Sequence, residues 1–175
     1  MEIQDPAIKM QLNDISTAND AELLNMLPEL RKSGRSILVQ PLIKRWRMSQ
    51  SEELSEALFH LFCDIKDQET LSYFMEAISV ETDNHFLNSL LSVLWLSSLD
   101  ASEHLHDLIS VALSGDFMTV VEVSTIIENM DVEFNEDEVM EAMYQIDERL
   151  TEESDQEYIV VFQQLKEIVN KLNVS

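Results

Sequence analysis

The chain has 175 residues, 45% of them hydrophobic, and its 34 acidic and 11 basic residues give a formal charge of −23 at pH 7. This length is sufficient for one hydrophobic core and short for two domains. The negative charge disfavours nucleic acid and anionic membranes as partners, because both require positive charge facing phosphate. It favours a protein partner with a basic patch, or serves solubility alone.

The numbers of glycines and cysteines indicate the fold class and the cellular compartment. The chain has two glycines, Gly34 and Gly115, and three prolines. Sheet-rich folds and nucleotide-binding loops need more glycine at their sharp turns, so this composition predicts an all-α protein. One cysteine, Cys63, leaves no internal disulfide and fits a reducing compartment. The opening residues do not resemble a secretory signal, and we therefore predict a cytoplasmic protein.

Apolar residues recur at helical spacing along most of the chain, after an N-terminal segment, 1–19, that we expect to be partly flexible. The predicted helices cover 20–33, 36–48, 51–65, 68–80, 86–96, 105–113 and 117–130, followed by two closing helices around Val139 and Phe162. Pro28 and Pro41 are expected to bend or interrupt the first two helices. The β-branched run 120–127 leaves a strand possible at that point.

Five helix starts are marked by a capping side chain that lies three residues before an acidic one. The pairs are Asn19 with Glu22, Ser49 with Glu52, Asp100 with Glu103, Asn135 with Glu138, and Ser154 with Glu157. Such pairs satisfy backbone N–H groups and place negative charge at the positive end of the helix dipole. Each pair therefore predicts a helix start.

Two helices joined by a short polar turn recur three times, over 36–67, 68–100 and 101–131. This period of about 31 to 34 residues is typical of helical arrays. A single helix pair cannot bury its apolar face, so the pairs are expected to stack. A plain helical bundle is the alternative.

The segment 51–67, Ser-Glu-Glu-Leu-Ser-Glu-Ala-Leu-Phe-His-Leu-Phe-Cys-Asp-Ile-Lys-Asp, resembles the second helix and exit turn of a short bacterial HEAT-like repeat. The resemblance extends over 36–131, although the arginine and paired small residues usual in those helices are absent. It implies a right-handed α-α superhelix, with repeats over 20–134 and capping helices of the same domain over 135–175. It also implies a non-enzymatic scaffold that binds proteins.

In that family the second helices build the binding surface. The corresponding polar residues here are Glu53, Glu56, His60, Asn88, Ser92 and Glu122. A second candidate surface is basic: six of the 11 basic residues lie within 31–47, including Arg45 and Arg47, with no acidic residue between 31 and 48. This segment either docks against acids of the same chain or contacts an acidic partner.

The remaining clusters do not predict chemistry. His104 and His106 are two residues apart and point to different sides of a helix, so they do not suit one metal ion. The acidic run 131–138 lacks the glycine and the final glutamate of a calcium loop. Cys63 is expected to be an inert thiol. We predict no catalytic, cofactor-binding or metal-binding residue, and the alternative function is an acidic, immunity-type inhibitor of a basic toxin or nuclease.

Overall fold

The computed structural model describes residues 5–174, and over this range it contains ten α-helices. The predicted all-α fold is confirmed, because β structure among these residues is limited to one bridge between Phe134 and Val174. The described residues form two compact units, with 5–77 and 97–99 in unit 1 and 78–96 and 100–174 in unit 2. In this part of the chain no helix is long and apolar enough to cross a membrane.

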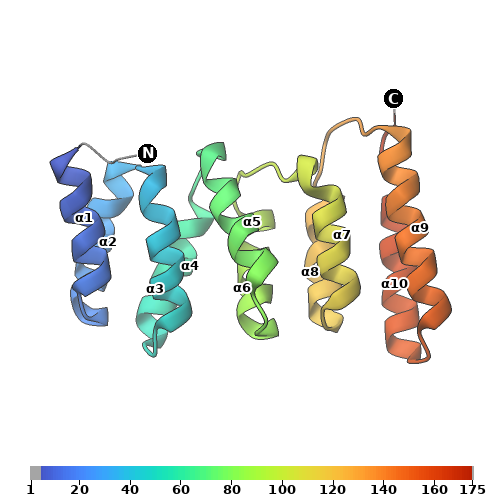
Figure 1. Ribbon diagram of the computed structural model, residues 1–175, viewed down its shortest axis with the longest axis horizontal. Coiled ribbons are helices and arrows are strands. Elements are labelled where there is room, and N and C mark those ends of the chain that lie inside the picture. Colours follow the sequence, from blue (N-terminus) through green and yellow to red (C-terminus); the bar gives the residue numbers. More distant parts are fainter. Residues whose placement is uncertain (1–4, 175) are drawn as a thin grey trace. The chain divides into compact units, whose positions relative to one another are not determined.

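Unit 1 is built from stacked helix pairs. Its helices are α1 (Pro6–Thr17), α2 (Asp20–Ser33), α3 (Val39–Met48), α4 (Glu52–Cys63) and most of α5 (Leu71–Val80). Helix α1 packs against α3, and α2 packs against α4 (Figure 1). First helices therefore stack on first helices and second helices on second helices, as expected for stacked repeats.

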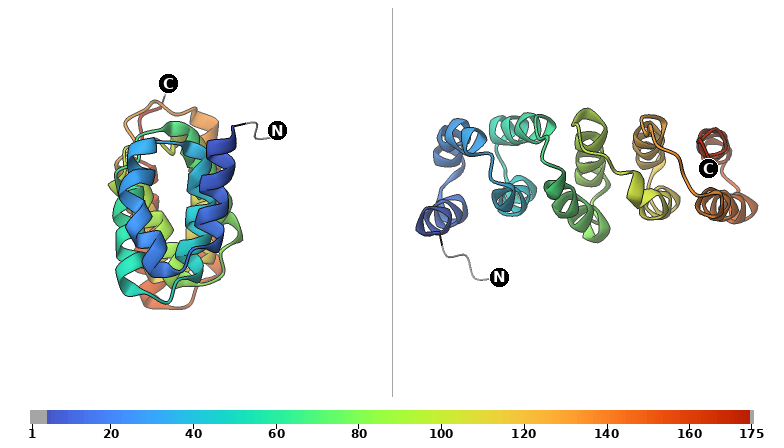
Figure 2. Two further views of the ribbon diagram at one scale, coloured as in Figure 1. Left: turned by 90° about the vertical axis from the view of Figure 1, so that its left-hand side faces the viewer. Right: turned by 90° about the horizontal axis from the view of Figure 1, so that it is seen from above.

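Unit 2 follows the same rule. Its helices are α6 (Asn84–Leu96), α7 (Leu105–Ser114), α8 (Phe117–Glu128), α9 (Glu136–Glu152) and α10 (Gln156–Val169). Helix α7 packs against α9, while α8 packs against both α6 and α10 (Figure 2). Four side chains that are less than 2% exposed, Leu90, Leu108, Ile127 and Phe162, come from four of these helices and mark the core of the unit.

The repeat predicted from the sequence is confirmed in the lengths of its elements. Each of the three predicted pairs opens with a three-residue 3-10 turn, at Ser36–Leu38, Gln68–Thr70 and Ser102–His104. Each turn leads into a first helix of 10 residues, α3, α5 or α7, and then into a second helix of 12 or 13 residues, α4, α6 or α8. The same order of turn, short helix and longer helix thus occurs three times.

Helix α1 lies within the segment 1–19, where the apolar pattern predicted no helix. It starts with a proline at its first position, and Asp5 caps it by accepting a hydrogen bond from the Ala7 N–H at 2.8 Å. Ile15 is its one buried residue, so the helix has almost no apolar stripe from which it could be predicted.

The β-branched run 120–127 forms part of helix α8, and the strand alternative was wrong. Val120, Val123, Ile126 and Ile127 are buried, and their spacing of three and four residues places them on one face of a helix. Branching at Cβ lowers helix propensity only slightly. Burial of this face against α6, α7 and α10 therefore decides the conformation.

Pro28 and Pro41 were expected to bend or interrupt their helices, and neither proline interrupts its helix. Pro41 is the third residue of α3, in the first turn, where backbone N–H groups have no partner within the helix. Pro28 lies inside α2, and the helix nevertheless continues to Ser33.

Two of the five predicted caps, Asn19 and Asn135, cap α2 and α9. Two others were displaced, because Ser51 caps α4 and Asp155 caps α10 in place of Ser49 and Ser154. The fifth, Asp100, accepts the N–H of Ser102 ahead of a 3-10 turn.

Arginine side chains donate hydrogen bonds to carbonyl oxygens at two of the turns between paired helices. Arg45 of α3 donates from Nη1 to the carbonyl oxygens of Ile15, at 2.7 Å, and Ala18, at 2.6 Å. Arg149 of α9 donates from Nε to the carbonyl oxygen of Leu113, at 3.4 Å. Terminal carbonyls of a helix have no partner within the helix, so each arginine satisfies groups of the preceding pair.

Candidate functional site

The predicted binding residues of α4 lie on the surface of unit 1. Glu53, Glu56 and His60 are all exposed. His60 Nε2 lies 3.8 Å from Glu56 Oε1, one helical turn away. These three side chains share the outward face of α4.

The basic segment docks largely within its own chain. Arg45 is half-buried, and besides the two carbonyls it contacts Asp20 Oδ1 at 3.0 Å from Nη2. Arg47 is exposed and also has a contact within the chain. Further ion pairs of this segment join Arg31 to Asp64 at 2.8 Å, Lys32 to Glu29 at 2.8 Å, and Arg35 to Asp5 at 3.3 Å. Arg45, one of the predicted binding residues, thus contacts other parts of its own chain, and internal docking is the alternative that these contacts favour.

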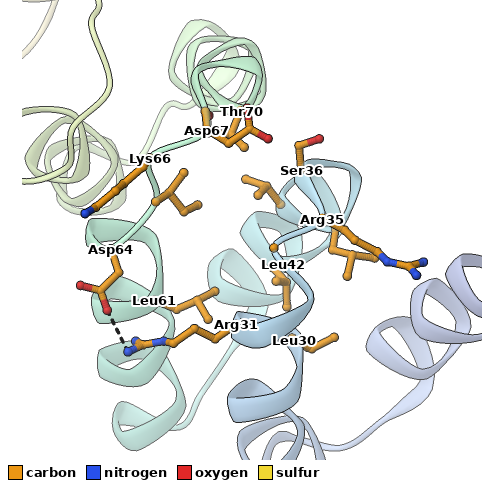
Figure 3. A pocket seen from close by; sticks show the side chains of 14 residues that line it. Leu30, Arg31, Arg35, Ser36, Leu42, Leu61, Asp64, Lys66, Asp67 and Thr70 are labelled. Atoms are coloured by element: carbon orange, nitrogen blue, oxygen red, sulfur yellow. Dashed lines mark hydrogen bonds and ion pairs between the residues drawn. The ribbon is translucent and has the colours of Figure 1, made fainter.

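A cavity of about 260 Å³ lies between the ends of α2 and α4 in unit 1 (Figure 3). Leu30, Leu42 and Leu61 give it a largely aliphatic lining. At its rim Arg31 is directed at Asp64, while the guanidinium of Arg35 points away from the cavity. Arg31 and Asp64 thus pair with each other at the rim, and Arg35 pairs with Asp5, which does not line the cavity.

Two of the predicted residues in unit 2, Asn88 and Ser92, are half-buried, and Asn88 links α6 to the start of α8. Asn88 Nδ2 donates to Asp116 Oδ1 at 3.3 Å, and the hydroxyl of buried Thr119 lies 2.8 Å from Asn88 Oδ1. Ser92 donates to the carbonyl oxygen of Asn88 at 2.9 Å. Asn88 is therefore engaged in helix packing, and it is not a free polar group of the surface.

Asp116 is the centre of this cluster and the N-cap of α8. Partial burial by itself would raise the pKa of Asp116. Hydrogen bonds from the Thr119 backbone N–H, the Thr119 hydroxyl, Asn88 and the Met118 N–H outweigh burial and lower the pKa below its usual range. The carboxylate is thus held ionised at the positive end of α8.

Replacing Gly115 with alanine should lower the free energy of unfolding by about 1 to 3 kcal/mol, because the added carbon overpacks this cluster. A Cβ at Gly115 would lie 2.4 Å from Thr119 Cγ2. Gly34→Ala is the matched comparison: its φ is +59°, but nothing lies within 4 Å of the added carbon, so it should cost about 1 kcal/mol of backbone strain alone. Urea denaturation followed by circular dichroism measures both. A smaller loss of unfolding free energy for Gly115→Ala than for Gly34→Ala would contradict the close packing of Gly115 against Thr119.

Glu122, the third predicted residue of unit 2, lies beside an exposed tryptophan. Trp95 at the end of α6 is 38% exposed, and its Nε1 donates to Glu122 Oε2 at 2.6 Å. Met118, 49% exposed, lies one turn before Glu122 on the same side of α8. Ser92, Trp95, Met118 and Glu122 are called the α6–α8 face below.

A second cavity, of about 320 Å³, lies in unit 2 and is strongly acidic. Its apolar lining consists of Leu105, Val132, Phe134 and Ala142, and its acidic lining of Glu103, Glu133, Glu138 and Glu141. These residues come from the 3-10 turn Ser102–His104 and the start of α7, from the segment before α9, and from α9 itself. We call this the acidic cavity. Sequence reasoning missed it, because Glu103 lies 30 or more residues before the other three glutamates in the chain.

The acidic run 131–138, which lacks the glycine and final glutamate of a calcium loop, forms one wall of the acidic cavity. Asn135 caps α9, accepting the Asp137 N–H at 2.8 Å, as predicted. Buried Phe134 donates its N–H to the carbonyl oxygen of Asn173 at 2.8 Å, so the C-terminal segment holds this wall in place.

His104, His106 and Cys63 have separate surroundings. His104 Nδ1 lies 3.0 Å from Asp107 Oδ2, whereas His106 Nδ1 lies 3.0 Å from Gln145 Nε2. Burial, and then the charge of Asp64, raise the pKa of the Cys63 thiol, which favours its protonated form. Within residues 5–174 no three His, Cys, Asp or Glu side chains are placed to hold one metal ion.

The negative charge of the chain is concentrated in unit 2. This unit contains 21 acidic and three basic residues, a net charge of −18 out of −23. Unit 1 contains the other 13 acidic and eight basic residues. Unit 2 is therefore the part of the chain that attracts a cation most strongly.

Comparison with known proteins gives no relative. No protein-family model matches the chain, and neither the curated proteins nor the solved structures contain a match. The two cavities, the exposed tryptophan and the distribution of charge are therefore the features that bear on function.

Proposed function

We propose that the chain is a non-enzymatic scaffold of the HEAT-like type, which binds a protein partner through a basic patch on that partner. The observation that carries this proposal is the acidic cavity of unit 2, with four glutamates around an apolar lining. The HEAT-like assignment is supported by the three equal helix pairs and by the stacking of like helices within each unit.

The acidic cavity suits a lysine or arginine side chain. Such side chains combine an apolar stem with a cationic head. Leu105, Phe134 and Ala142 offer contacts for the stem, while the surrounding glutamates offer oxygens for the head. A volume of about 320 Å³ is near the lower end of the range for ligand pockets, which fits one or two side chains rather than a large cofactor.

The charge of unit 2 supports the same kind of partner. A surface with a net charge of −18 attracts a basic protein before contact and so raises the association rate. Exposed charges are screened beyond about 8 Å at physiological ionic strength, so association should slow as salt is added. With a single cysteine in the chain, we place this binding in a reducing compartment such as the cytoplasm.

The test compares three immobilised forms of the chain as baits in a native lysate. The first is the natural sequence. In the second, Glu103, Glu133, Glu138 and Glu141 are replaced by glutamine. In the third, the same change in charge is made at exposed glutamates that do not line the cavity, namely Glu148, Glu152, Glu157 and Glu167. The affinity of the cavity variant for its partner should fall about tenfold, because exposed ion pairs contribute about 0.2 to 1 kcal/mol each.

The control variant should keep most of that binding, and quantitative mass spectrometry of the captured proteins measures both. Equal loss from the two variants would indicate a general charge effect and reject the cavity as the site. Captured proteins without a basic patch would reject the proposed partner class.

The immunity-type inhibitor is a second candidate, favoured by the concentration of acidic residues in unit 2. An inhibitor blocks the activity of its target by covering basic residues, whereas a scaffold leaves the partner active. Assaying the captured partner with and without a stoichiometric amount of the chain separates the two functions.

A further inference from the structure

We infer that the α6–α8 face binds the guanidinium group of an arginine on the partner, with Trp95 as a stacking surface and Glu122 as the ion-pair acceptor. This inference rests on the proposed function in taking the partner to be basic. It names a second contact on helices other than α7 and α9, which line the acidic cavity.

Trp95 and Glu122 of this face already hold each other in position. The hydrogen bond from Trp95 Nε1 to Glu122 Oε2, at 2.6 Å, fixes the indole against α8 while 38% of the residue stays exposed. Among the described residues Glu122 has no further polar partner, so its Oε1 can accept a hydrogen bond. Fixing these groups in advance reduces the conformational entropy that binding would otherwise cost.

The chemistry of this pair favours arginine over lysine. A cation over an aromatic face is attracted by the ring quadrupole, and indole is the strongest of the aromatic side chains in this respect. The planar guanidinium can stack on the ring and still direct an N–H group at a carboxylate, whereas an ammonium acts as a point charge. Met118 beside Glu122 adds an exposed, polarisable side chain against which the arginine stem can pack.

Charge complementarity also favours a cation at this face. Unit 2 has a net charge of −18, so a cationic group is attracted here and an anionic group is repelled. Aromatic residues, methionine and arginine are the side chains most enriched at protein interfaces, and this face presents the first two.

The test uses the indole N–H signals of the full chain in nuclear magnetic resonance spectra. The chain has two tryptophans, exposed Trp95 and buried Trp46, so the Trp46 signal serves as an internal control. The probes are three capped peptides in which four arginines, four lysines or four citrullines alternate with serine. The arginine peptide should shift the Trp95 signal and leave the Trp46 signal in place. The lysine peptide should bind several-fold more weakly, and the neutral citrulline peptide should cause no shift.

Three variants separate stacking from charge. Trp95→Leu and Glu122→Gln should each weaken binding of the arginine peptide by about tenfold, while Trp95→Phe should retain part of it. Because the Trp95 variants lack the reporting indole, the affinity of all three variants is measured by titration calorimetry with the same peptide. Surface substitutions of this kind change stability little, and circular dichroism checks the fold. Equal affinity for the arginine and lysine peptides would overturn the inference.

The outcomes also distinguish this inference from the proposed function. Binding of the arginine peptide that leaves the Trp95 signal unmoved would overturn the inference while leaving the acidic cavity as the site. If the Trp95 signal still shifts in a chain whose four cavity glutamates are replaced, the inference is supported. If the same replacements do not reduce capture of a partner, the cavity is rejected as the site while the inference stands.

Discussion

Replacing Phe62 with alanine should lower the free energy of unfolding by about 3 to 5 kcal/mol, a large part of the 5 to 15 kcal/mol of a typical domain. Phe62 of α4 has no exposed surface, and its ring centroid lies 5.4 Å from those of both Trp46 and Phe74. The alanine variant would leave a cavity where three helices, α3, α4 and α5, meet. Urea denaturation followed by circular dichroism measures the loss.

Phe117→Ala is the matched control, because it removes the same atoms from a side chain that is 41% exposed. It should change stability by much less, since Phe117 is already 41% exposed and the substitution removes less buried apolar area. Similar losses for the two variants would mean that Phe62 is not at the centre of the unit 1 core.

Replacing Arg45 with methionine should destabilise the chain by about 2 to 3 kcal/mol. The variant keeps an apolar stem but leaves the carbonyl oxygens of Ile15 and Ala18 without their charged donor. Hydrogen bonds to charged groups contribute about 1.5 to 3 kcal/mol, and the Arg45 side chain is only 16% exposed, so solvent screens this contact little. Thermal and urea unfolding should both report the loss.

Lys44→Met makes the same change of charge at the preceding, exposed position and should shift stability by about 0.5 kcal/mol or less. If instead Arg45→Met left stability unchanged and abolished partner binding, the residue would be a contact residue and its structural assignment wrong. This comparison decides between the two interpretations of the basic segment.

Much of the fold was predictable because most helices bury a stripe of apolar residues. The repeat, its turns and the helical conformation around Val120 all follow from such spacing and from burial. Helix α1 was missed because Ile15 alone is buried and its start depends on Asp5 and Pro6. Caps such as Ser51 and Asp155 were misplaced by one or two residues, since neighbouring polar residues offer equivalent oxygens.

The candidate site was less predictable, because its parts come from distant segments. The polar residues Asn88 and Glu122 were correctly placed on second helices, but their partners Thr119 and Trp95 lie 31 and 27 residues away in the chain. A one-dimensional pattern shows which face of a helix is polar, and it does not show which polar groups bind one another. For the same reason the acidic cavity between α7 and α9 could not be predicted.

The two arginines that close turns between paired helices have a consequence for how the chain opens. In an array of helix pairs, stability is the sum of the stability of each pair and of its nearest-neighbour interfaces. Arg45 and Arg149 each bond a turn of one pair to a first helix of the next pair, and so place a polar bond on that interface. A turn held in this way cannot fray alone, because opening it also breaks the bond to the neighbour. Amide hydrogens on both sides should then exchange as one cooperative unit, which makes the interface rather than the single helix the step in which each unit comes apart.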